Sequence, residues 1–313
     1  VIEAVVEDLE IKRKLFETLE SKVRGETVLA TNTSSLSISE IGALCKNKER
    51  LIGLHFFNPV HRMPLVEIVV DPITSAQTIA TSVQFIKELG KVPIVVKNAP
   101  GFLVNRILMP YLNEAAHLLS EGIPVSIIDE VMLDFGMPMG PFTLLDTIGI
   151  DVAQKVAHIL YRGFGERMKP HDVLDRVVAS GFYGAKNKKG FYLQNGKQRI
   201  ENPAIYSLLG LTPKREEPIS EEWQMRMVVQ MIHEAIRCLE DGIVHDPSHL
   251  DLAMIYGIGF PPFRKGLLWY ADQLGGDKVL SELDIFHRHY GIRFDPPNIL
   301  KEWVQSGRKI YGN

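Results

Sequence analysis

The sequence predicts an α/β domain with a partial, Rossmann-type parallel sheet, followed by an all-α region made of two related helical modules. Short apolar runs alternate with amphipathic helical stretches up to about residue 97, as in parallel α/β sheets. From there to the C-terminus, the apolar residues follow helical spacing. Within that helical region one sequence pattern occurs twice, which indicates duplicated modules.

The α/β region, residues 1–97, opens with V-I-E-A-V-V, an apolar run typical of a buried strand. A helix with one apolar stripe is predicted over residues 9–23, and Gly25 ends it. Further strands are predicted at T-V-L-A-T, L-I-G-L-H-F, V-E-I-V-V and V-P-I-V-V. Between them we expect a short helix from Ser37 to about Cys45 and a longer one from Ser75 to about Leu89.

The helical region contains an internal repeat. N-E-A-A-H-L-L-S-E-G-I, from Asn113, matches H-E-A-I-R-C-L-E-D-G-I, from His233. We therefore predict two modules, residues 98–195 and 196–313, each burying one face against a neighbour, with their boundary near Gly196. The lysine-rich connector over residues 186–197 is interpreted as a solvated surface, with a polyphosphate contact as the alternative.

Composition limits the class of protein. The chain has 313 residues, 45% of them hydrophobic and 23% charged, which is typical of a globular protein of two or three domains. A net charge of -3, with the basic residues spread along the chain, gives no footprint for nucleic acid. Cys45 and Cys238 lie far apart, so neither a disulfide framework nor a zinc site is predicted. No metal-ligand spacing links the histidines, and no apolar stretch reaches membrane-spanning length.

Three polar side chains stand out in the segment from Asn32 to Glu67. Ser34 and His55 follow predicted strand ends, and Glu67 lies among apolar residues, where a carboxylate needs a partner. An imidazole whose far nitrogen binds a carboxylate has a fixed tautomer and is suited to act as a base. We therefore predict a proton-transfer site, shielded from water by Phe56 and Phe57.

Each of these side chains also has a plainer interpretation. A histidine beside a strand is often only structural, and Ser34 suits the cap of the next helix. A hydrolase triad of Ser34, His55 and Glu67 is a further alternative, although no G-x-S-x-G elbow is present. Asn105 lies inside a helical apolar stripe, where an amide requires a specific partner.

The chain resembles the L-3-hydroxyacyl-CoA dehydrogenase family, in particular the dehydrogenase part of multifunctional fatty-acid oxidation proteins. The matching segments include T-N-T-S-S-L, G-L-H-F-F-N-P-V, M-P-L-V-E-I-V, K-N-A-P-G-F-L-V-N-R and M-G-P-F-T-L-L-D. The resemblance implies reversible hydride transfer between C3 of a 3-hydroxyacyl-CoA thioester and NAD. It assigns His55 as the general base and Glu67 as its orienting carboxylate. Ser34 and Asn105 are expected to bind the substrate oxygen or to hold the site's geometry.

The resemblance also implies binding residues. For NAD these are Val5, Val6, Glu7, Lys12, Asn32, Ser34 and Asn58. For substrate they are Ser34, Asn105 and Tyr256. No metal site is implied.

The resemblance further implies that this sequence is part of a longer protein. The family's Gly-rich NAD fingerprint is expected to precede Val1, so we expect the chain to bind NAD weakly, to turn over little and to expose its first strand as a sheet edge. An upstream enoyl-CoA hydratase domain and a thiolase subunit are the expected partners. The alternative function is a non-catalytic scaffold that binds CoA esters. The expected location is the bacterial cytoplasm, or a peroxisome or mitochondrion in a eukaryote.

Overall fold

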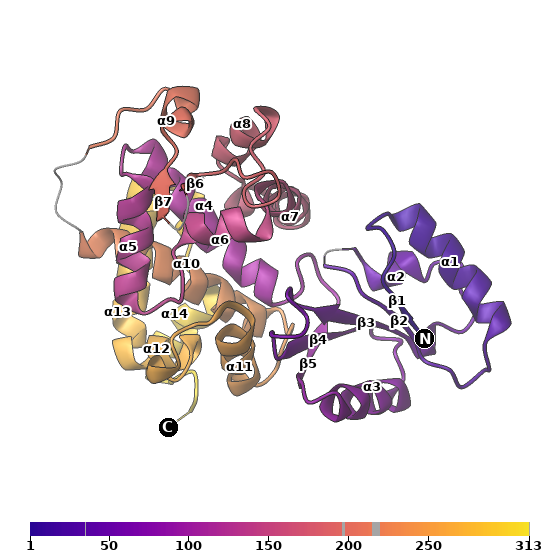
Figure 1. The fold of residues 1–313 in the computed structure, drawn as a ribbon. Coiled ribbons are helices and arrows are strands. Elements are labelled where there is room, and N and C mark those ends of the chain that lie inside the picture. The colour runs from indigo at the N-terminus through magenta and orange to yellow at the C-terminus, as the bar shows by residue number, and fades with distance from the viewer. Residues whose placement is uncertain (35, 196–197, 215–219, 313) are drawn as a thin grey trace. The chain divides into compact units, whose positions relative to one another are not determined.

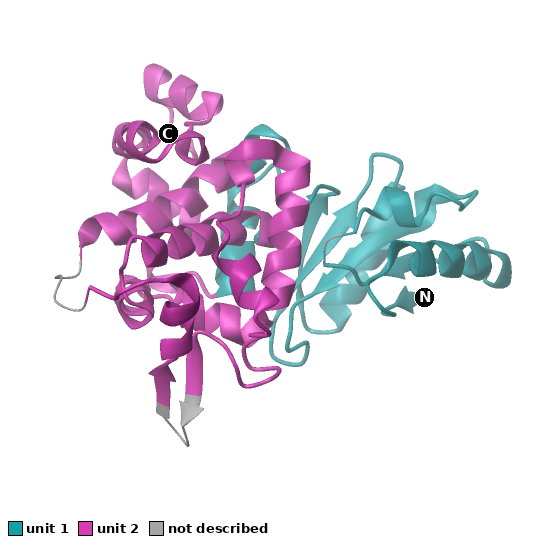
Figure 2. Cartoon of the chain, turned by 90° about the horizontal axis from the view of Figure 1, so that it is seen from above, with its two compact units in different colours: residues 1–104, 238–258 teal, residues 105–237, 259–313 magenta. Residues whose placement is uncertain are grey.

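The structure is a computed structural model, and it describes residues 1–34, 36–195, 198–214 and 220–312. The chain divides into two compact units (Figure 2). The first comprises Val1–Val104 and Cys238–Ile258, and the second comprises Asn105–Arg237 and Gly259–Asn313. No helix among these described residues is long and apolar enough to cross a membrane.

The first unit is built on a five-stranded sheet in the order β1-β2-β3-β4-β5 (Figure 1). Its strands are β1 (Ile2–Glu3), β2 (Leu29–Thr31), β3 (Leu51–Phe56), β4 (Leu65–Val70) and β5 (Val92–Lys97). Its helices are α1 (Leu9–Lys22), α2 (Ile38–Ile41), η1 (Lys48–Arg50), α3 (Ala76–Glu88) and α11 (Pro247–Ile258). The predicted alternation of strands and helices is confirmed, although β1 and α2 are shorter than expected.

The sheet departs from an all-parallel arrangement at one place. The pairs β1-β2, β2-β3 and β4-β5 are parallel, whereas β3 and β4 are antiparallel. A parallel connection requires a crossover of about a dozen residues or more. The segment 57–64 between β3 and β4 is too short for that, so β4 must turn back beside β3. This reversal places β3 and β4 residues directly opposite one another.

The two faces of the sheet are covered by different helices. Ile52 and Leu54 of β3 belong to a buried cluster that includes Ile86 of α3. Because side chains alternate along a strand, Gly53 and His55 point to the opposite face. There a side chain at Gly53 would collide with Ile38 of α2, since an added Cβ would lie 2.7 Å from the Ile38 Cδ1 atom. His55 therefore shares its face of the sheet with α2.

Helix α11 is distant in sequence but belongs to the first unit. A Cβ added to its Gly257 would lie 2.9 Å from Leu65 Cδ2 of β4 and 3.1 Å from Val104 Cγ2. A larger residue at this position would require these side chains to shift, so glycine suits the close approach of helix and strand. The compact units thus cut the chain differently from the three predicted segments 1–97, 98–195 and 196–313, whose boundaries remain predictions. The expected boundary near Gly196 lies outside the described residues.

The second unit is mainly helical. Its elements are α4 (Val104–Ser120), α5 (Val125–Phe135), α6 (Pro141–Ile148), α7 (Ile150–Phe164), η2 (Gly165–Met168), α8 (Val173–Ala179), β6 (Tyr192–Asn195), β7 (Gln198–Glu201), α9 (Pro203–Leu209), α10 (Glu221–Glu240), η3 (Pro262–Arg264), α12 (Leu267–Leu274), α13 (Gly276–Tyr290), η4 (Ile292–Phe294) and α14 (Asn298–Ser306). The antiparallel hairpin β6-β7 is not predicted by the sequence patterns, because its lysine-rich surroundings indicate only a connector.

The repeat in sequence corresponds to a repeat of structure and contacts. The order α4, α5, α6, α7, η2, α8 is matched by α10, α11, α12, α13, η4, α14. At the equivalent helix end in each copy, a carboxylate accepts two backbone amides. Asp146 accepts those of residues 191 and 192, and Asp272 those of residues 310 and 311. Two related modules are therefore present.

Buried ion pairs connect α4 and α10. Arg226 of α10 lies 2.5 Å from Glu114 of α4, and Arg106 of α4 lies 2.5 Å from Glu234 of α10. The η2 and η4 segments each add an arginine, at positions 167 and 293, to one of these carboxylates. The carboxylates and the two helical arginines are at most 1% exposed. Burial of this kind requires all four charges to be paired.

Candidate active site

His55 and Glu67 form a buried pair at the junction of β3 and β4. The antiparallel register places them directly opposite each other, and His55 Nδ1 lies 2.6 Å from Glu67 Oε2. An ionised carboxylate only accepts hydrogen bonds, so Nδ1 carries the proton and Nε2 presents a lone pair. Among the described residues, Nε2 has no hydrogen-bond partner. The predicted pairing of imidazole and carboxylate is confirmed in geometry.

The second oxygen of Glu67 is held by the main chain. Its Oε1 accepts the backbone N–H groups of Leu103, at 3.1 Å, and Val104, at 2.9 Å, where α4 begins. A carboxylate at a helix N-terminus is stabilised by these amides and by the helix dipole. Glu67 is fully buried, so these donors compensate for its lost hydration.

Aromatic rings surround the imidazole. The ring centroids of His55 and Phe57 are 4.4 Å apart, and those of His55 and Phe102 are 5.7 Å apart. The histidine is only 4% exposed. The predicted water-excluding contact therefore comes from Phe57 and, unexpectedly, from Phe102. The prediction was wrong for Phe56, which packs against the core cluster of Ile52 and Leu54.

A buried lysine fixes the carboxyl ends of β1 and β2. Lys12 of α1 is fully buried, and its Nζ lies 2.6 Å from Glu3 Oε1 and 3.3 Å from the Asn32 carbonyl oxygen. Glu3 also accepts the Thr31 hydroxyl at 2.7 Å and the Val5 amide at 2.7 Å. Lys12 therefore holds the two loops together. Its role toward NAD remains a prediction.

The loop after β2 joins this edge to the histidine strand. Glu7 Oε1 accepts the Thr33 hydroxyl at 2.5 Å and the Ser34 amide at 3.0 Å. The side chain of Asn32 accepts the Phe56 amide at 3.3 Å, next to His55. Ser34 itself is exposed. The structure thus brings Glu7, on the loop after β1, together with Asn32 and Ser34, on the loop after β2, beside the histidine strand.

The remaining predicted residues occupy separate positions. Val5, Val6 and Asn58 are exposed, on the loops after β1 and β3. Tyr256 is 38% exposed on α11, next to the Gly257 that contacts β4. Asn105 follows Val104 in the first turn of α4 and is half-buried. The roles assigned to these five residues remain predictions.

Sequence reasoning missed three contributors to this site. They are the Phe102 ring and the backbone amides of Leu103 and Val104. Backbone donors have no residue signature, but the Pro-Gly pair before Phe102 was a usable signal, since a turn there aims the following amides in a fixed direction.

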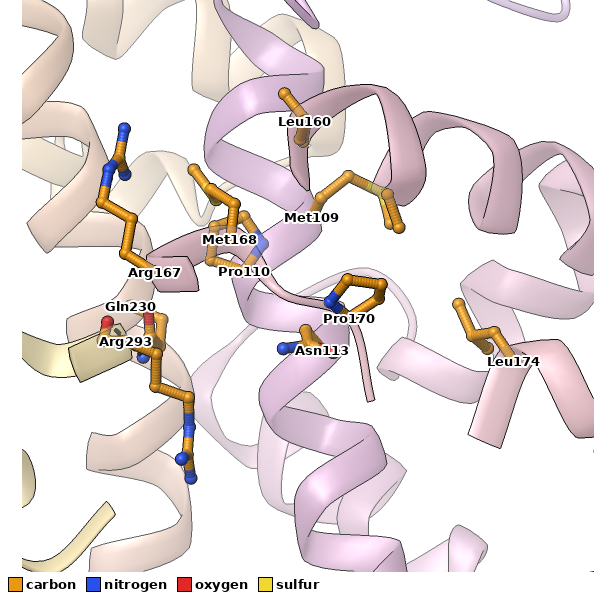
Figure 3. Close-up of a pocket in the computed structure, with 11 residues that line it drawn as sticks. Met109, Pro110, Asn113, Leu160, Arg167, Met168, Pro170, Leu174, Gln230 and Arg293 are labelled. Atoms are coloured by element: carbon orange, nitrogen blue, oxygen red, sulfur yellow. Dashed lines mark hydrogen bonds between the residues drawn. The ribbon is translucent and has the colours of Figure 1, made fainter. Parts of the chain in front are cut away.

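The second unit contains a small cavity of about 20 Å³, lined by Met109, Asn113, Arg167, Pro170, Gln230, Arg293 and neighbouring side chains (Figure 3). That volume corresponds to a single water molecule. The cavity is therefore too small for a dinucleotide or a CoA ester. No cluster of His, Cys, Asp or Glu among the described residues has the arrangement of a metal site.

Comparison with known proteins identifies the family. The family model described as "3-hydroxyacyl-CoA dehydrogenase, NAD binding domain" matches residues 1–99. The family's C-terminal domain matches residues 101–194 and 224–311, in agreement with the internal repeat. The chain belongs to the 3-hydroxyacyl-CoA dehydrogenase family.

Relatives in this family share the whole length of the chain. The fatty acid oxidation complex subunit alpha of Vibrio vulnificus is 45% identical over 314 residues, and that of Shewanella amazonensis is 46% identical over 316 residues. The chain spans 44% of the length of each of these relatives. The crystal structure of 3-hydroxybutyryl-CoA dehydrogenase from Escherichia coli is 28% identical, with a TM-score of 0.82, and the match covers 98% of this chain and 82% of that one.

The family assignment corrects one expectation. We expected residues 1–97 to be only the C-terminal part of an NAD-binding domain whose Gly-rich half is missing, because no Gly-rich fingerprint occurs in the sequence. The family's NAD binding domain instead matches residues 1–99, so that domain is present. The expectation of weak NAD binding loses its basis.

Proposed function

We propose that this protein catalyses the NAD-dependent interconversion of L-3-hydroxyacyl-CoA and 3-ketoacyl-CoA in fatty-acid β-oxidation. The observation that carries the proposal is the buried His55–Glu67 pair in a member of this family, with Nδ1 bound to the carboxylate and Nε2 left to accept a proton. Proton removal from a hydroxyl is the part of the reaction that a protein side chain must perform.

His55 is the general base in the oxidative direction. Its Nε2 takes the proton of the substrate's 3-hydroxyl group, and Glu67 stabilises the imidazolium that forms. In reduction the same nitrogen returns the proton to the carbonyl oxygen. Because Phe57 and Phe102 keep water from the ring, the charge interaction between His55 and Glu67 is strong.

The edge formed by β1 and β2 fits NAD. The loop residues Val5 and Val6 are exposed, and Glu7 is a 40% exposed carboxylate that can accept hydrogen bonds from ribose hydroxyls. Such an edge, at the carboxyl ends of parallel strands, is where dinucleotides bind in Rossmann-type sheets. When bound, NAD supplies the hydride acceptor. Lys12 and Asn32 keep this edge and the histidine strand in register, and Asn58 is the proposed contact from the β3 side.

Ser34 and Asn105 are the proposed hydrogen-bond donors to the reacting oxygen of the substrate, and Tyr256 is a proposed substrate contact. An oxygen that gains negative charge as its proton leaves is stabilised by such donors. The family resemblance supports all three roles.

The longer relatives suggest a wider assembly. Because the relatives are named as subunits of a fatty acid oxidation complex and are more than twice as long as this chain, an enoyl-CoA hydratase domain and a thiolase subunit are the proposed partners. Their bacterial origin supports the bacterial cytoplasm as the location. A non-catalytic scaffold remains the competing function.

The test is acetoacetyl-CoA-dependent NADH oxidation by the full-length protein and by its His55→Gln variant. We expect this substitution to lower kcat by roughly 10²- to 10⁴-fold, the usual contribution of a general acid or base. His61→Gln, which changes an exposed histidine nearby, serves as the control and is expected to leave kcat unchanged. Full activity in His55→Gln would remove the base assignment, and an inactive wild-type protein would favour the scaffold.

A further inference from the structure

The chain makes an unusual turn just before α4. The Phe102 amide donates to the Ala99 carbonyl oxygen at 2.9 Å, so residues 99–102 form a tight turn. Pro100 and Gly101 are its central residues, and Gly101 has a φ of 72°, as the second central residue of a type II turn requires.

Phe102 continues the turn in a conformation that glycine normally occupies. Its φ is 51°, in the left-handed region that few residues with a side chain adopt. Strained backbone of this kind persists only where the surroundings hold it, and it is concentrated at functional sites. The Phe102 side chain is fully buried, so packing of its ring offsets the strain.

The consequence of the turn lies in the next two residues. Directly after the left-handed pair, the amides of Leu103 and Val104 both point to one atom, Glu67 Oε1. The other oxygen of Glu67 binds His55. The turn therefore acts on the imidazole through a single carboxylate.

We propose that Phe102 is a positioning residue whose left-handed backbone aims the Leu103 and Val104 amides at Glu67 and thereby fixes His55 for proton transfer. The proposal rests on the dehydrogenase function proposed above. The backbone conformation carries this role, and the ring's contribution is to hold that conformation. If so, relaxing the turn lowers kcat, because the base loses its orientation. It leaves KM almost unchanged, because Phe102 and Glu67 are fully buried and their side chains are closed to a ligand.

Two substitutions separate the backbone from the ring. Phe102→Ala and Phe102→Gly both delete the ring and differ by one methyl group. Alanine resists the left-handed conformation, whereas glycine adopts it freely. We expect Phe102→Ala to lose about five- to thirtyfold more kcat than Phe102→Gly, the population ratio that corresponds to the usual cost of a left-handed residue. KM for acetoacetyl-CoA is expected to be similar in both. Equal loss of kcat in the two variants would overturn the proposal and leave Phe102 as a packing residue.

A second measurement does not depend on catalysis. Amide hydrogen exchange at Leu103 and Val104 reports whether these N–H groups stay bound to Glu67. We expect exchange to accelerate by about five- to thirtyfold in Phe102→Ala relative to Phe102→Gly. If the Leu103 and Val104 amides are protected from exchange as well in Phe102→Ala as in Phe102→Gly, the inference is refuted, whatever reaction the protein catalyses. If wild-type protein lacks dehydrogenase activity while the exchange contrast holds, the proposed function fails and the positioning of Glu67 stands.

Gly101→Ala provides a test that keeps the aromatic ring. This substitution strains the other left-handed residue of the turn and leaves the Phe102 side chain in place. The Gly101→Ala variant can be used if the Phe102 variants, which lack the buried ring, do not fold. We expect the same selective loss of kcat and the same faster exchange of the two amides. Normal kcat and normal exchange in Gly101→Ala would contradict the aiming role of the turn.

Discussion

Glu67→Gln is the substitution that tests the catalytic geometry most directly. It preserves the size of the side chain and removes its charge. A glutamine has one accepting oxygen and one donating nitrogen, while Glu67 now accepts from His55 on one side and from the Leu103 and Val104 amides on the other. The glutamine must therefore turn its nitrogen to one of these two sides.

The energies of the two orientations decide the outcome. Turning the nitrogen toward Leu103 and Val104 leaves two buried N–H groups without an acceptor, at about 1–3 kcal/mol each. Turning it toward His55 requires only that Nδ1 become the acceptor, because the imidazole can change its tautomer. We expect the second orientation, which places the proton on Nε2, the atom that must accept the substrate's proton. The loss of charge from three hydrogen bonds costs about 2–3 kcal/mol of stability.

The predicted result is an enzyme that folds but barely turns over. The equivalent change in the orienting carboxylate of a serine protease triad reverses the tautomer and costs about 10⁴ in kcat, and we expect about 10³- to 10⁴-fold here. Acetoacetyl-CoA-dependent NADH oxidation measures kcat, urea unfolding measures stability, and ¹⁵N NMR of the histidine ring identifies the tautomer. Glu26→Gln, at an exposed position of the same unit, is the control. A kcat within tenfold of wild type, or an Nδ1–H tautomer in the variant, would refute the reasoning.

Other predictions concern the buried charges. Lys12→Met leaves the buried Glu3 without its cation, so we expect urea unfolding to show a loss of about 3 kcal/mol in the free energy of unfolding. Fluorescence titration is expected to show weaker NADH binding. Equal effects from Lys14→Met, which changes an exposed lysine on α1, would argue against this. Glu234→Gln removes the buried carboxylate charge that Arg106 and Arg167 both contact, and a loss well below about 3–5 kcal/mol would show that these pairs contribute little. Burial, with help from the nearby Arg293, lowers the pKa of His117 to about 3. In the unfolded chain His117 binds a proton near pH 6.5, whereas in the folded protein it stays neutral to a much lower pH. The folded protein therefore keeps its full stability above pH 6.5 and loses stability as the pH falls toward 3. We expect His117→Gln to remove about 2 kcal/mol of the stability lost between pH 7 and pH 5, and an unchanged pH dependence would contradict the assignment.

Local sequence patterns predicted most of the elements correctly. The apolar runs at β3, β4 and β5 and the apolar stripes of α1 and α3 have periods that depend only on neighbouring residues. Strand direction is different, because it depends on whether a crossover fits between two strands. The 57–64 segment is too short for a crossover, so its length alone was sufficient to indicate the antiparallel β3-β4 pair. The patterns of polarity were not sufficient to indicate it.

The site was predictable in its side chains and not in its backbone. His55 and Glu67 could be paired from sequence, since a buried carboxylate requires a partner. The amides of Leu103 and Val104 could not, because every residue but proline carries the same N–H group. Lys12 was predicted as a ligand contact, but its complete burial against Glu3 depends on how α1 packs over β1 and β2.

The two modules share the same buried arginine and glutamate pairs, but one helix occupies a different place in each. The sequence match predicted related helices, and the structure shows that the matching glutamates, Glu114 and Glu234, each bind an arginine of the other copy's helix. Each copy carries an arginine and a glutamate at matching positions. The arginine of one copy can bind the glutamate of the other only if the two helices face each other, so the repeat specifies how α4 and α10 are arranged. The copies then diverge at their next helices. Helix α5 remains in the second unit, whereas α11 packs against β4 through Gly257 and brings Tyr256 into the unit that contains His55. Duplication thus explains how the modules hold together, and the departure from symmetry at α11 explains how the second module also places a whole helix in the unit that contains His55.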